Sequence, residues 1–200
     1  MKNRFKTIDL TMVGLFVALM AIGANTTSFL VIGGVPITLQ TFFSILAGAI
    51  LGSRIGALSM LVYALVGIVG APVFAQFTGG AAILVKPMFG FIISFILVSY
   101  IVGKIIEKTN KPTVRRFIFA SLIGMAINYV IGTNWMYMAY KIWAQAPEGF
   151  TYKMVWVWML APLPKDIILS IVSGLVAPRI YFIVQKSNPL TKRNLVSDRV

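Results

Sequence analysis

The residues best suited to binding chemistry are an adjacent lysine and aspartate near the start of the last long apolar segment. Lys165 and Asp166 follow the sequence Ala-Pro-Leu-Pro at residues 161–164. A carboxylate accepts hydrogen bonds and an ammonium group donates them, so the two together can hold a small polar ring or a carboxylate group. The alternative is an ion pair that only anchors the helix end at the membrane interface. Ionisable residues inside a membrane are costly and often functional, and we therefore rank this pair first.

Uncharged polar side chains are the next candidates, and they gather toward the predicted outer ends of the apolar segments. Thr38, Gln40 and Thr41 begin the second segment, and Asn128 lies in the fifth. The apolar loop at residues 72–78 is expected beside them. Such side chains commonly bond neighbouring helices, and for any single Thr or Asn this alternative is the more frequent role. Their concentration at one end nevertheless predicts a pocket that opens to the outside.

The composition excludes most soluble and catalytic classes of protein. Hydrophobic residues make up 58% of the 200 residues, charged residues 12%, and the mean hydropathy is +0.89. These values predict a membrane domain. The chain has no Cys and no His, which excludes disulfides, thiolate nucleophiles, imidazole bases and Cys/His zinc sites. It also lacks a Gly-x-x-x-x-Gly-Lys-Ser/Thr phosphate loop, so any ATP drive must come from partners. We expect no catalytic residue, no cofactor and no metal site.

Charges and turn residues divide the chain into six apolar segments that are long enough to cross a membrane as helices. The predicted spans are residues 10–31, 37–53, 55–71, 84–105, 116–143 and 161–185. The expected fold is all-α, a single integral membrane domain over residues 1–200 that ends in a basic cytoplasmic tail at 186–200. The first segment follows three basic residues, as a signal peptide does, but it exceeds a normal signal-peptide core and is expected to be retained.

The distribution of basic residues predicts the orientation in the membrane. With the N-terminus inside, fourteen of the 18 Lys and Arg residues fall on the cytoplasmic side. The outer side holds Lys86, Lys141, Lys153 and Lys165. By the positive-inside rule, both termini are cytoplasmic. The net charge of +13 therefore reflects topology and attraction to anionic lipid headgroups, and nucleic acid is a poor candidate partner.

Small residues recur at helical spacing in the first segment. Gly14, Ala18 and Ala21 lie along one side of the predicted helix. Small residues let helices approach closely, so this face either packs against neighbouring helices of the same chain or docks a partner protein. Spacing alone favours packing within the chain.

A dense series of Gly, Pro and aromatic residues extends from residue 33 to residue 91. It contains the run GGVPITLQTF at 33–42, Leu-Ala-Gly at 46–48, Leu51-Gly52, Gly56, Tyr63, Gly67, Gly-Ala-Pro-Val-Phe-Ala at 70–75, Gly79-Gly80, Pro87 and Gly90. In order and spacing, these motifs resemble the signature of the BioY family of biotin transporters. The six-span pattern and the Pro-x-Asp turn at residues 164–166 extend the resemblance over most of the chain.

This resemblance implies a substrate-capture subunit, or S component, of an energy-coupling-factor (ECF) transporter in a bacterial plasma membrane. Such a subunit binds biotin from outside and associates with a transmembrane coupling protein and two ATPase subunits. In the family, the loop between the first two helices and the loop after the third cover the ligand. The resemblance also favours the docking interpretation of Gly14, Ala18 and Ala21, because the family uses this face to contact the coupling protein.

For the pocket, the resemblance implies that Asp166 accepts the ureido N–H groups of biotin and that Lys165 donates to a ligand oxygen. Further polar contacts are expected from Gln40, Thr38, Thr41 and Asn128, and apolar walls from Phe74, Tyr63 and Trp135. The sequence departs from the family pattern at two places. A lysine that commonly follows the aspartate by three residues is replaced by Leu169, and the Gly-Pro-Thr-Gly-Gly-Tyr motif reads Lys-Pro-Met-Phe-Gly-Phe at residues 86–91. Lys86 can compensate by reaching the ligand carboxylate.

Two other functions remain as alternatives. The departures at residues 86–91 and at Leu169 leave room for an S component that binds a different vitamin. A membrane enzyme or scaffold subunit without transport activity is the second alternative. The absence of His and Cys, and the single carboxylate within a predicted span, argue against an enzyme.

Overall fold

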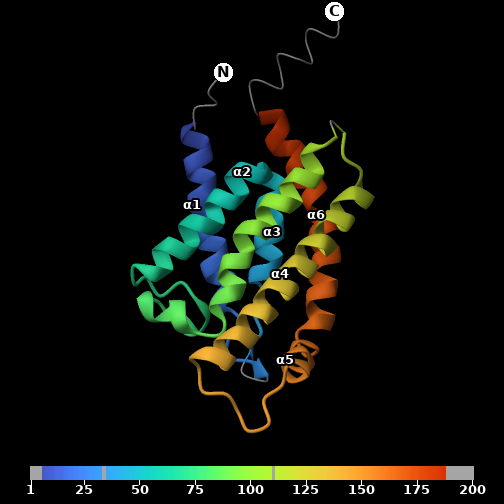
Figure 1. Ribbon diagram of the computed structural model, residues 1–200. Coiled ribbons are helices and arrows are strands. Elements are labelled where there is room, and N and C mark those ends of the chain that lie inside the picture. The colour runs from blue at the N-terminus through green and yellow to red at the C-terminus, as the bar shows by residue number, and fades with distance from the viewer. Residues whose placement is uncertain (1–5, 33–34, 110, 188–200) are drawn as a thin grey trace, which may run out of the picture.

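Long apolar stretches of the chain form the helices of a bundle in the computed structural model, which describes residues 6–32, 35–109 and 111–187 (Figure 1). Within this part of the chain, five helices are long and apolar enough to cross a membrane. The helices are α1 (Thr7–Asn25), α2 (Gln40–Ile68), α3 (Phe89–Glu107), α4 (Val114–Ile142), the short α5 (Tyr152–Met159) and α6 (Leu163–Ser187). The last residues of the predicted basic tail, 188–200, lie outside the described part.

Helix α2 reverses direction at Gly52, which has φ 83° and ψ 174°. Only glycine adopts such a conformation without a steric penalty. The Nε2 of Gln40 donates to the hydroxyl of Tyr63 at 2.8 Å, although the two residues would lie about 35 Å apart along a straight helix. A Cβ placed on Gly56 would lie 2.9 Å from the Cα of Gly48. Residues 40–51 and 53–68 are therefore two antiparallel arms, and the break predicted between the spans 37–53 and 55–71 is present as a sharp turn.

A carboxylate from α3 fixes this turn. Glu107 accepts hydrogen bonds from the Ser53 backbone N–H at 2.7 Å and from the Ser53 hydroxyl at 2.8 Å. These bonds satisfy a donor at the start of the second arm that has no partner within the helix. Small residues bring α3 close to the first arm, since a Cβ on Gly48 would lie 2.2 Å from the carbonyl oxygen of Ser99. Here the small residues serve packing within the chain.

The segment after α1 differs from the prediction, because the helix ends at Asn25 and not near residue 31. Residues Val31–Ile32 (β1) pair antiparallel with Val35–Pro36 (β2). The hydroxyl of Thr27 donates to the carbonyl of Ile37 at 2.6 Å, which turns the chain back after the helix. The expected all-α fold therefore contains one short strand pair.

The structure differs from the prediction at two further places, one around Pro87 and one just before α6. The fourth span, predicted to begin at residue 84, begins later: residues 81–85 form the short 3₁₀ helix η2 (Ala81–Val85), and α3 starts only at Phe89. Pro87 lacks the N–H that a continuous helix would need there. The short α5 was not among the predicted spans. The Thr151 hydroxyl accepts from the Met154 N–H at its N-terminus, at 3.3 Å.

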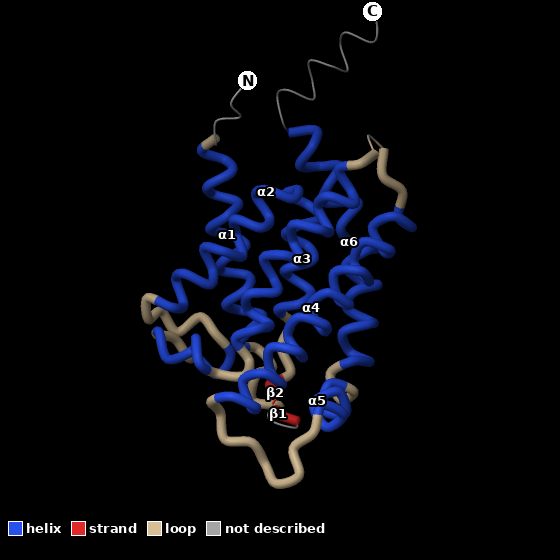
Figure 2. Tube along the Cα trace, viewed as in Figure 1, coloured by secondary structure: helices blue, strands red, loops and turns tan. Residues whose placement is uncertain are grey.

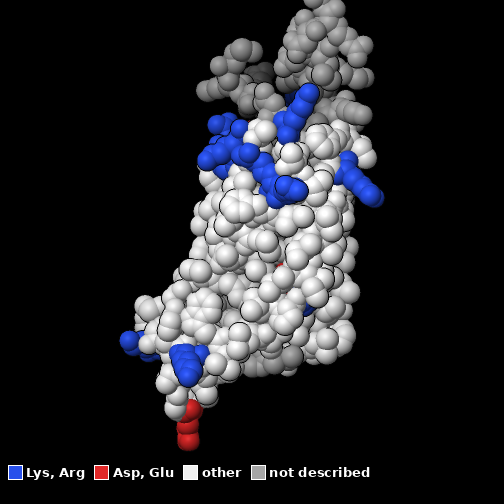
Figure 3. Space-filling model, turned by 90° about the vertical axis from the view of Figure 1, so that its right-hand side faces the viewer, with Lys and Arg blue, Asp and Glu red and all other residues white. Residues whose placement is uncertain are grey.

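The connections after α1, after α2 and after α4 gather with the strand pair at one end of the bundle, and the start of α1 and the end of α6 lie at the other (Figures 1 and 2). On the face shown in Figure 3, Lys and Arg side chains appear near both ends, with the larger group at the end of α1 and α6. A broad band with almost no charged surface lies between them. This pattern is typical of a protein that crosses a membrane.

Candidate ligand-binding site

A cavity of about 140 Å³ lies at the end of the bundle where the loops gather. Engineered cavities of about 150 Å³ accept benzene, so this one has room for a ring-sized group without rearrangement. Its walls come from segments far apart in the sequence: the start of α2, the turn at residues 74–78, the start of α3, the middle of α4 and the start of α6. Eight of the ten predicted ligand-contacting residues line it: Thr38, Gln40, Thr41, Phe74, Lys86, Asn128, Lys165 and Asp166.

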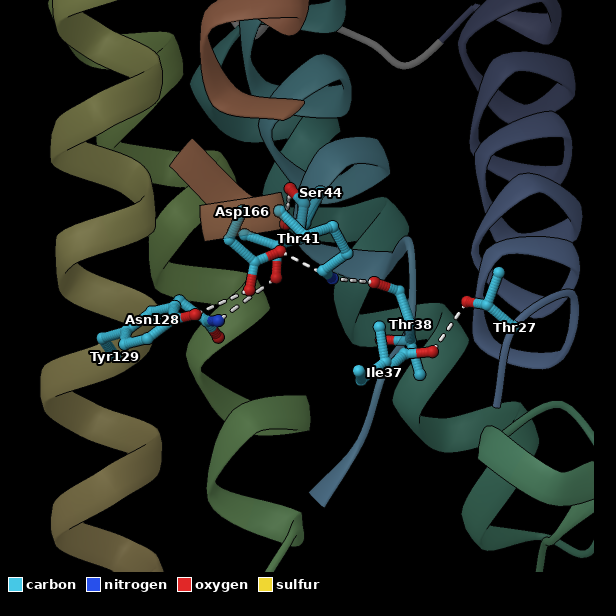
Figure 4. Close-up of polar contacts among 9 residues, drawn as sticks. Thr27, Ile37, Thr38, Thr41, Ser44, Asn128, Tyr129 and Asp166 are labelled. Atoms are coloured by element: carbon cyan, nitrogen blue, oxygen red, sulfur yellow. Dashed lines mark hydrogen bonds and ion pairs between the residues drawn. The ribbon is translucent and has the colours of Figure 1, made fainter. Parts of the chain in front are cut away.

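Asp166 is the charged centre of the cavity. Its side chain is only 6% exposed, and one carboxylate oxygen lies 2.8 Å from the Nζ of Lys165. The other oxygen accepts a 2.8 Å hydrogen bond from the hydroxyl of Tyr129 on α4. Figure 4 shows the carboxylate of Asp166 between α6 and the tyrosine ring. The Nζ of Lys165 also donates to the carbonyl of Thr38. The ion pair is thus built into the pocket and does not simply anchor a helix end.

Asn128 is the second polar centre, and it joins three helices. Its Nδ2 donates to the Thr41 hydroxyl at 3.3 Å, and its Oδ1 accepts from the Ser94 hydroxyl at 2.6 Å. Thr41 and Asn128 are both almost fully buried. The orientation of the Asn128 amide is therefore fixed before a ligand arrives, which is the arrangement that specific pockets use.

The remaining walls are mostly apolar, with one exposed cation. Apolar walls come from Phe74 in the turn, from Phe91, Ile92 and Phe95 on α3, and from Met159 at the end of α5. Lys86 also lines the cavity, is exposed to solvent, and makes no ion pair within the described part of the chain. The cavity is therefore acidic and polar at one side, apolar in its walls, and has a cation available for an anionic group.

Two predicted wall residues lie outside the cavity lining. Tyr63 is fully buried behind Phe74, whose ring it meets edge-on at 5.4 Å, and its hydroxyl donates to the Val73 carbonyl at 3.0 Å. Trp135 packs instead against Gly90, where a Cβ would lie 2.2 Å from its own Cβ. Tyr63 thus lies behind the lining residue Phe74, whereas Trp135 packs against α3 at a residue that does not line the cavity.

The predicted docking residues lie on an open side of α1. Gly14 and Ala18 are exposed and Ala21 is half-buried. A Cβ placed on Gly14 would meet no atom within 4 Å. Packing within this chain therefore does not explain why position 14 is a glycine.

Sequence analysis missed several lining residues, of which Tyr129 is the most important. Its hydroxyl donates to Asp166, yet the polar residues predicted for the pocket were Asn, Thr, Gln and charged residues. A tyrosine hydroxyl in the middle of a predicted span needs a hydrogen-bond partner, and this need is the signal that could have identified it. Phe91 appeared in the sequence only as a lost hydroxyl relative to the family motif, whereas in the structure it is an apolar wall.

The fold and the site together define a class: a multi-pass membrane protein with a small, partly polar pocket near one end of its helix bundle. Comparison with known proteins then identifies the family. The model of the BioY family matches residues 1–186, and the chain belongs to this family.

Individual relatives support this assignment over nearly the full length. BioYB of Bacillus subtilis (strain 168) is 42% identical, and the alignment covers 98% of each chain. The biotin transporter BioY of Thermotoga maritima is 34% identical over 84% of this chain and 92% of its own. A crystal structure of the S-component for biotin from an ECF-type ABC transporter matches 90% of this chain and 94% of its own, with a TM-score of 0.76. At 24% sequence identity, this last similarity shows the fold.

Proposed function

We propose that this protein captures biotin from outside the cell as the S component of an ECF-type vitamin importer. The observation that supports this most strongly is the pocket built around Asp166 in a chain of the BioY family. Relatives across the family are named biotin transporters. Biotin combines a fused ring system, with a polar ureido group, and an aliphatic chain that ends in a carboxylate. An apolar pocket with a few fixed polar groups suits such a ligand.

The two polar centres suggest how biotin is held. Asp166 accepts the ureido N–H groups, and Lys165 donates to the ureido oxygen. Further polar contacts come from Asn128, Thr41, Thr38 and Gln40. Phe74 and Phe91 contact the ring system from the sides. The exposed Lys86 binds the carboxylate, because it is the described pocket cation that is not already paired with an acidic side chain.

In the membrane, the proposed topology has six crossings and two cytoplasmic termini. The reversal of α2 at Gly52 supports the number, because its two arms together with α1, α3, α4 and α6 give an even count of crossings. The larger group of basic side chains at the end of α1 and α6 supports the orientation (Figure 3). The pocket then opens toward the outside of the plasma membrane, where the ligand is found.

Import requires partners that hydrolyse ATP, and we assign their contact to α1. The open face at Gly14, Ala18 and Ala21 suits close approach of a helix from the transmembrane coupling protein. Two ATPase subunits would join the complex through that protein. Basic side chains at the cytoplasmic end contact anionic lipid headgroups.

Calorimetric titration of the detergent-purified protein, stripped of endogenous ligand, tests the proposed function. We expect tight one-to-one binding of biotin, weaker binding of desthiobiotin, and no binding of thiamine or riboflavin. Binding of thiamine or riboflavin without biotin would instead identify an S component for a different vitamin. A folded protein that binds none of these ligands would favour a scaffold subunit.

A further inference from the structure

One wall of the cavity is a tight turn, and its shape is unusual. The first and last residues of the turn, Phe74 and Thr78, form an antiparallel bridge. In this bridge the Phe74 N–H donates to the Thr78 carbonyl at 3.0 Å. The three residues between them form the short 3₁₀ helix η1 (Ala75–Phe77). All residues of the turn except Phe77 line the cavity. The position of this turn therefore determines whether the cavity is closed on that side.

The backbone of the turn is strained at two consecutive residues. Gln76 has φ 60° and ψ 33°, and Phe77 has φ 53°. Both values lie in the left-handed region, where the Cβ of a residue other than glycine approaches the backbone too closely. Within the described part of the chain, these are the only residues other than glycine with positive φ. Strain of this kind persists only where surrounding groups hold the backbone in place.

Two side chains at the C-terminal end of α1 hold both strained residues: Asn25 is the last residue of the helix and Ser28 follows it. The Phe77 N–H donates to the Oδ1 of Asn25 at 2.7 Å, and the Gln76 N–H donates to the hydroxyl oxygen of Ser28 at 3.1 Å. Asn25 is itself fixed, because its Nδ2 donates to the Ala21 carbonyl at 2.9 Å. Ser28 is 3% exposed. Each strained peptide thus has its own acceptor, supplied by a segment about 50 residues earlier in the chain.

The other side of the turn is fixed differently. Phe74 is buried against Gly67 and meets Tyr63 edge-on. This anchor is apolar and lies inside the bundle, whereas Gln76 and Phe77 are exposed to solvent. If the bonds from Asn25 and Ser28 were lost, the strained residues could relax while Phe74 stayed in place. The exposed part of the turn is therefore held through Asn25 and Ser28.

We propose that Asn25 and Ser28 are positioning residues that hold Gln76 and Phe77 in the left-handed conformation and thereby keep the turn 74–78 closed against the cavity. This proposal deepens the proposed function, on which it rests for the identity of the ligand. Its consequence is kinetic: the two side chains set how long bound biotin remains in the pocket.

The first measurement is the dissociation rate of labelled biotin from the purified full-length protein. We expect Asn25→Ala to release biotin about three- to tenfold faster, the loss that one hydrogen bond represents. Asn25→Asp keeps the acceptor oxygen and should restore most of the wild-type rate. Thermal unfolding in the absence of ligand shows whether each variant is folded.

A second substitution separates positioning from general stability. Phe77→Gly removes the steric penalty of the left-handed conformation, because glycine adopts positive φ freely. In the Asn25→Ala background it should therefore slow the release of biotin toward the wild-type rate. Phe77→Ala removes the same ring but keeps a Cβ, so it should give no rescue. Equal effects of the two substitutions would overturn the proposal.

Hydrogen exchange of the ligand-free protein provides a readout that does not depend on biotin. The amides of Gln76 and Phe77 should exchange faster in Asn25→Ala than in the wild type, while those of the α2 arms should not change. Faster exchange without faster release, or no change in exchange, would overturn the proposal. If the wild-type protein did not bind biotin, the proposed function and the kinetic role would both be refuted. The exchange experiment would still test the turn by itself: if Asn25→Ala left the protection of residues 76–77 unchanged, the positioning role of Asn25 would also be wrong.

Discussion

The hydroxyl of Tyr129 donates a 2.8 Å hydrogen bond to the carboxylate of Asp166, and this bond joins α4 to α6 at the wall of the cavity. The second oxygen of the same carboxylate is paired with Lys165. A buried carboxylate needs such partners, because burial of an uncompensated charge is costly. The partners also fix the direction of the carboxylate's remaining lone pairs. The site is therefore arranged to accept hydrogen bonds from a ligand before the ligand binds.

The first prediction concerns this carboxylate. Asp166→Asn should weaken biotin binding by about 1 to 3 kcal/mol, because the neutral amide is a poorer acceptor for two N–H groups. Tyr129→Phe removes one bond to the carboxylate and should cost about 1 kcal/mol. Lys165 is 27% exposed and can hydrate its ammonium group, so the Asp166 variant should still fold. Calorimetry with biotin measures both losses. Unchanged affinity in Asp166→Asn would remove this residue from the site.

The second prediction concerns the cation at residue 86. Lys86→Met should weaken biotin binding by about 1 kcal/mol, the contribution of a partly exposed ion pair. Binding of biotinamide, which has no carboxylate, should be the same in the variant and in the wild type. Lys153→Met is a matched control, because Lys153 is exposed and does not line the cavity. An equal loss for biotin and biotinamide would argue against a role of Lys86 in binding the carboxylate.

The third prediction concerns the support behind Phe74. A Cβ on Gly67 would lie 2.1 Å from the Phe74 ring, so Gly67→Ala must displace that ring from the cavity wall. We expect a loss of about 1 to 3 kcal/mol in the free energy of unfolding, typical of overpacking, together with weaker biotin binding. Adding Phe74→Leu to this variant should recover part of the stability, because the smaller side chain leaves room for the methyl group. No recovery in the double variant would mean that the two residues are not in steric conflict.

The sequence was sufficient to predict most of the polar residues that line the cavity, for a physical reason. Polar groups at membrane depth are costly, so Thr41, Asn128 and Asp166 stand out against an apolar background, and all three line the cavity. Aromatic residues give no such contrast. Tyr63 lies behind the lining residue Phe74 and Trp135 packs against Gly90, and only the three-dimensional packing shows this.

Tyr129 shows a second limit of the sequence. Neighbouring residues on a helix point about 100° apart, so Asn128 and Tyr129 would not be expected to face one pocket. They do so because α4 lies between other helices: Asn128 contacts Thr41 on α2, and Tyr129 contacts Asp166 on α6.

The reversal at Gly52 was predictable from its turn residues. The strained turn at residues 76–77 was not, because neither residue is a glycine.

The fourth prediction concerns the open face of α1. Gly14→Leu and Ala18→Leu should leave biotin binding unchanged, because both positions are exposed and neither lines the cavity. Uptake of labelled biotin by cells that co-express the coupling protein and the ATPase subunits should fall, since added bulk prevents close approach of helices. Val130→Leu, at an exposed position on α4, is the control and should leave uptake intact. Affinity purification of the complex then locates the defect. If the Gly14 and Ala18 variants still assemble with the coupling protein in wild-type amounts, this face of α1 is not the docking surface.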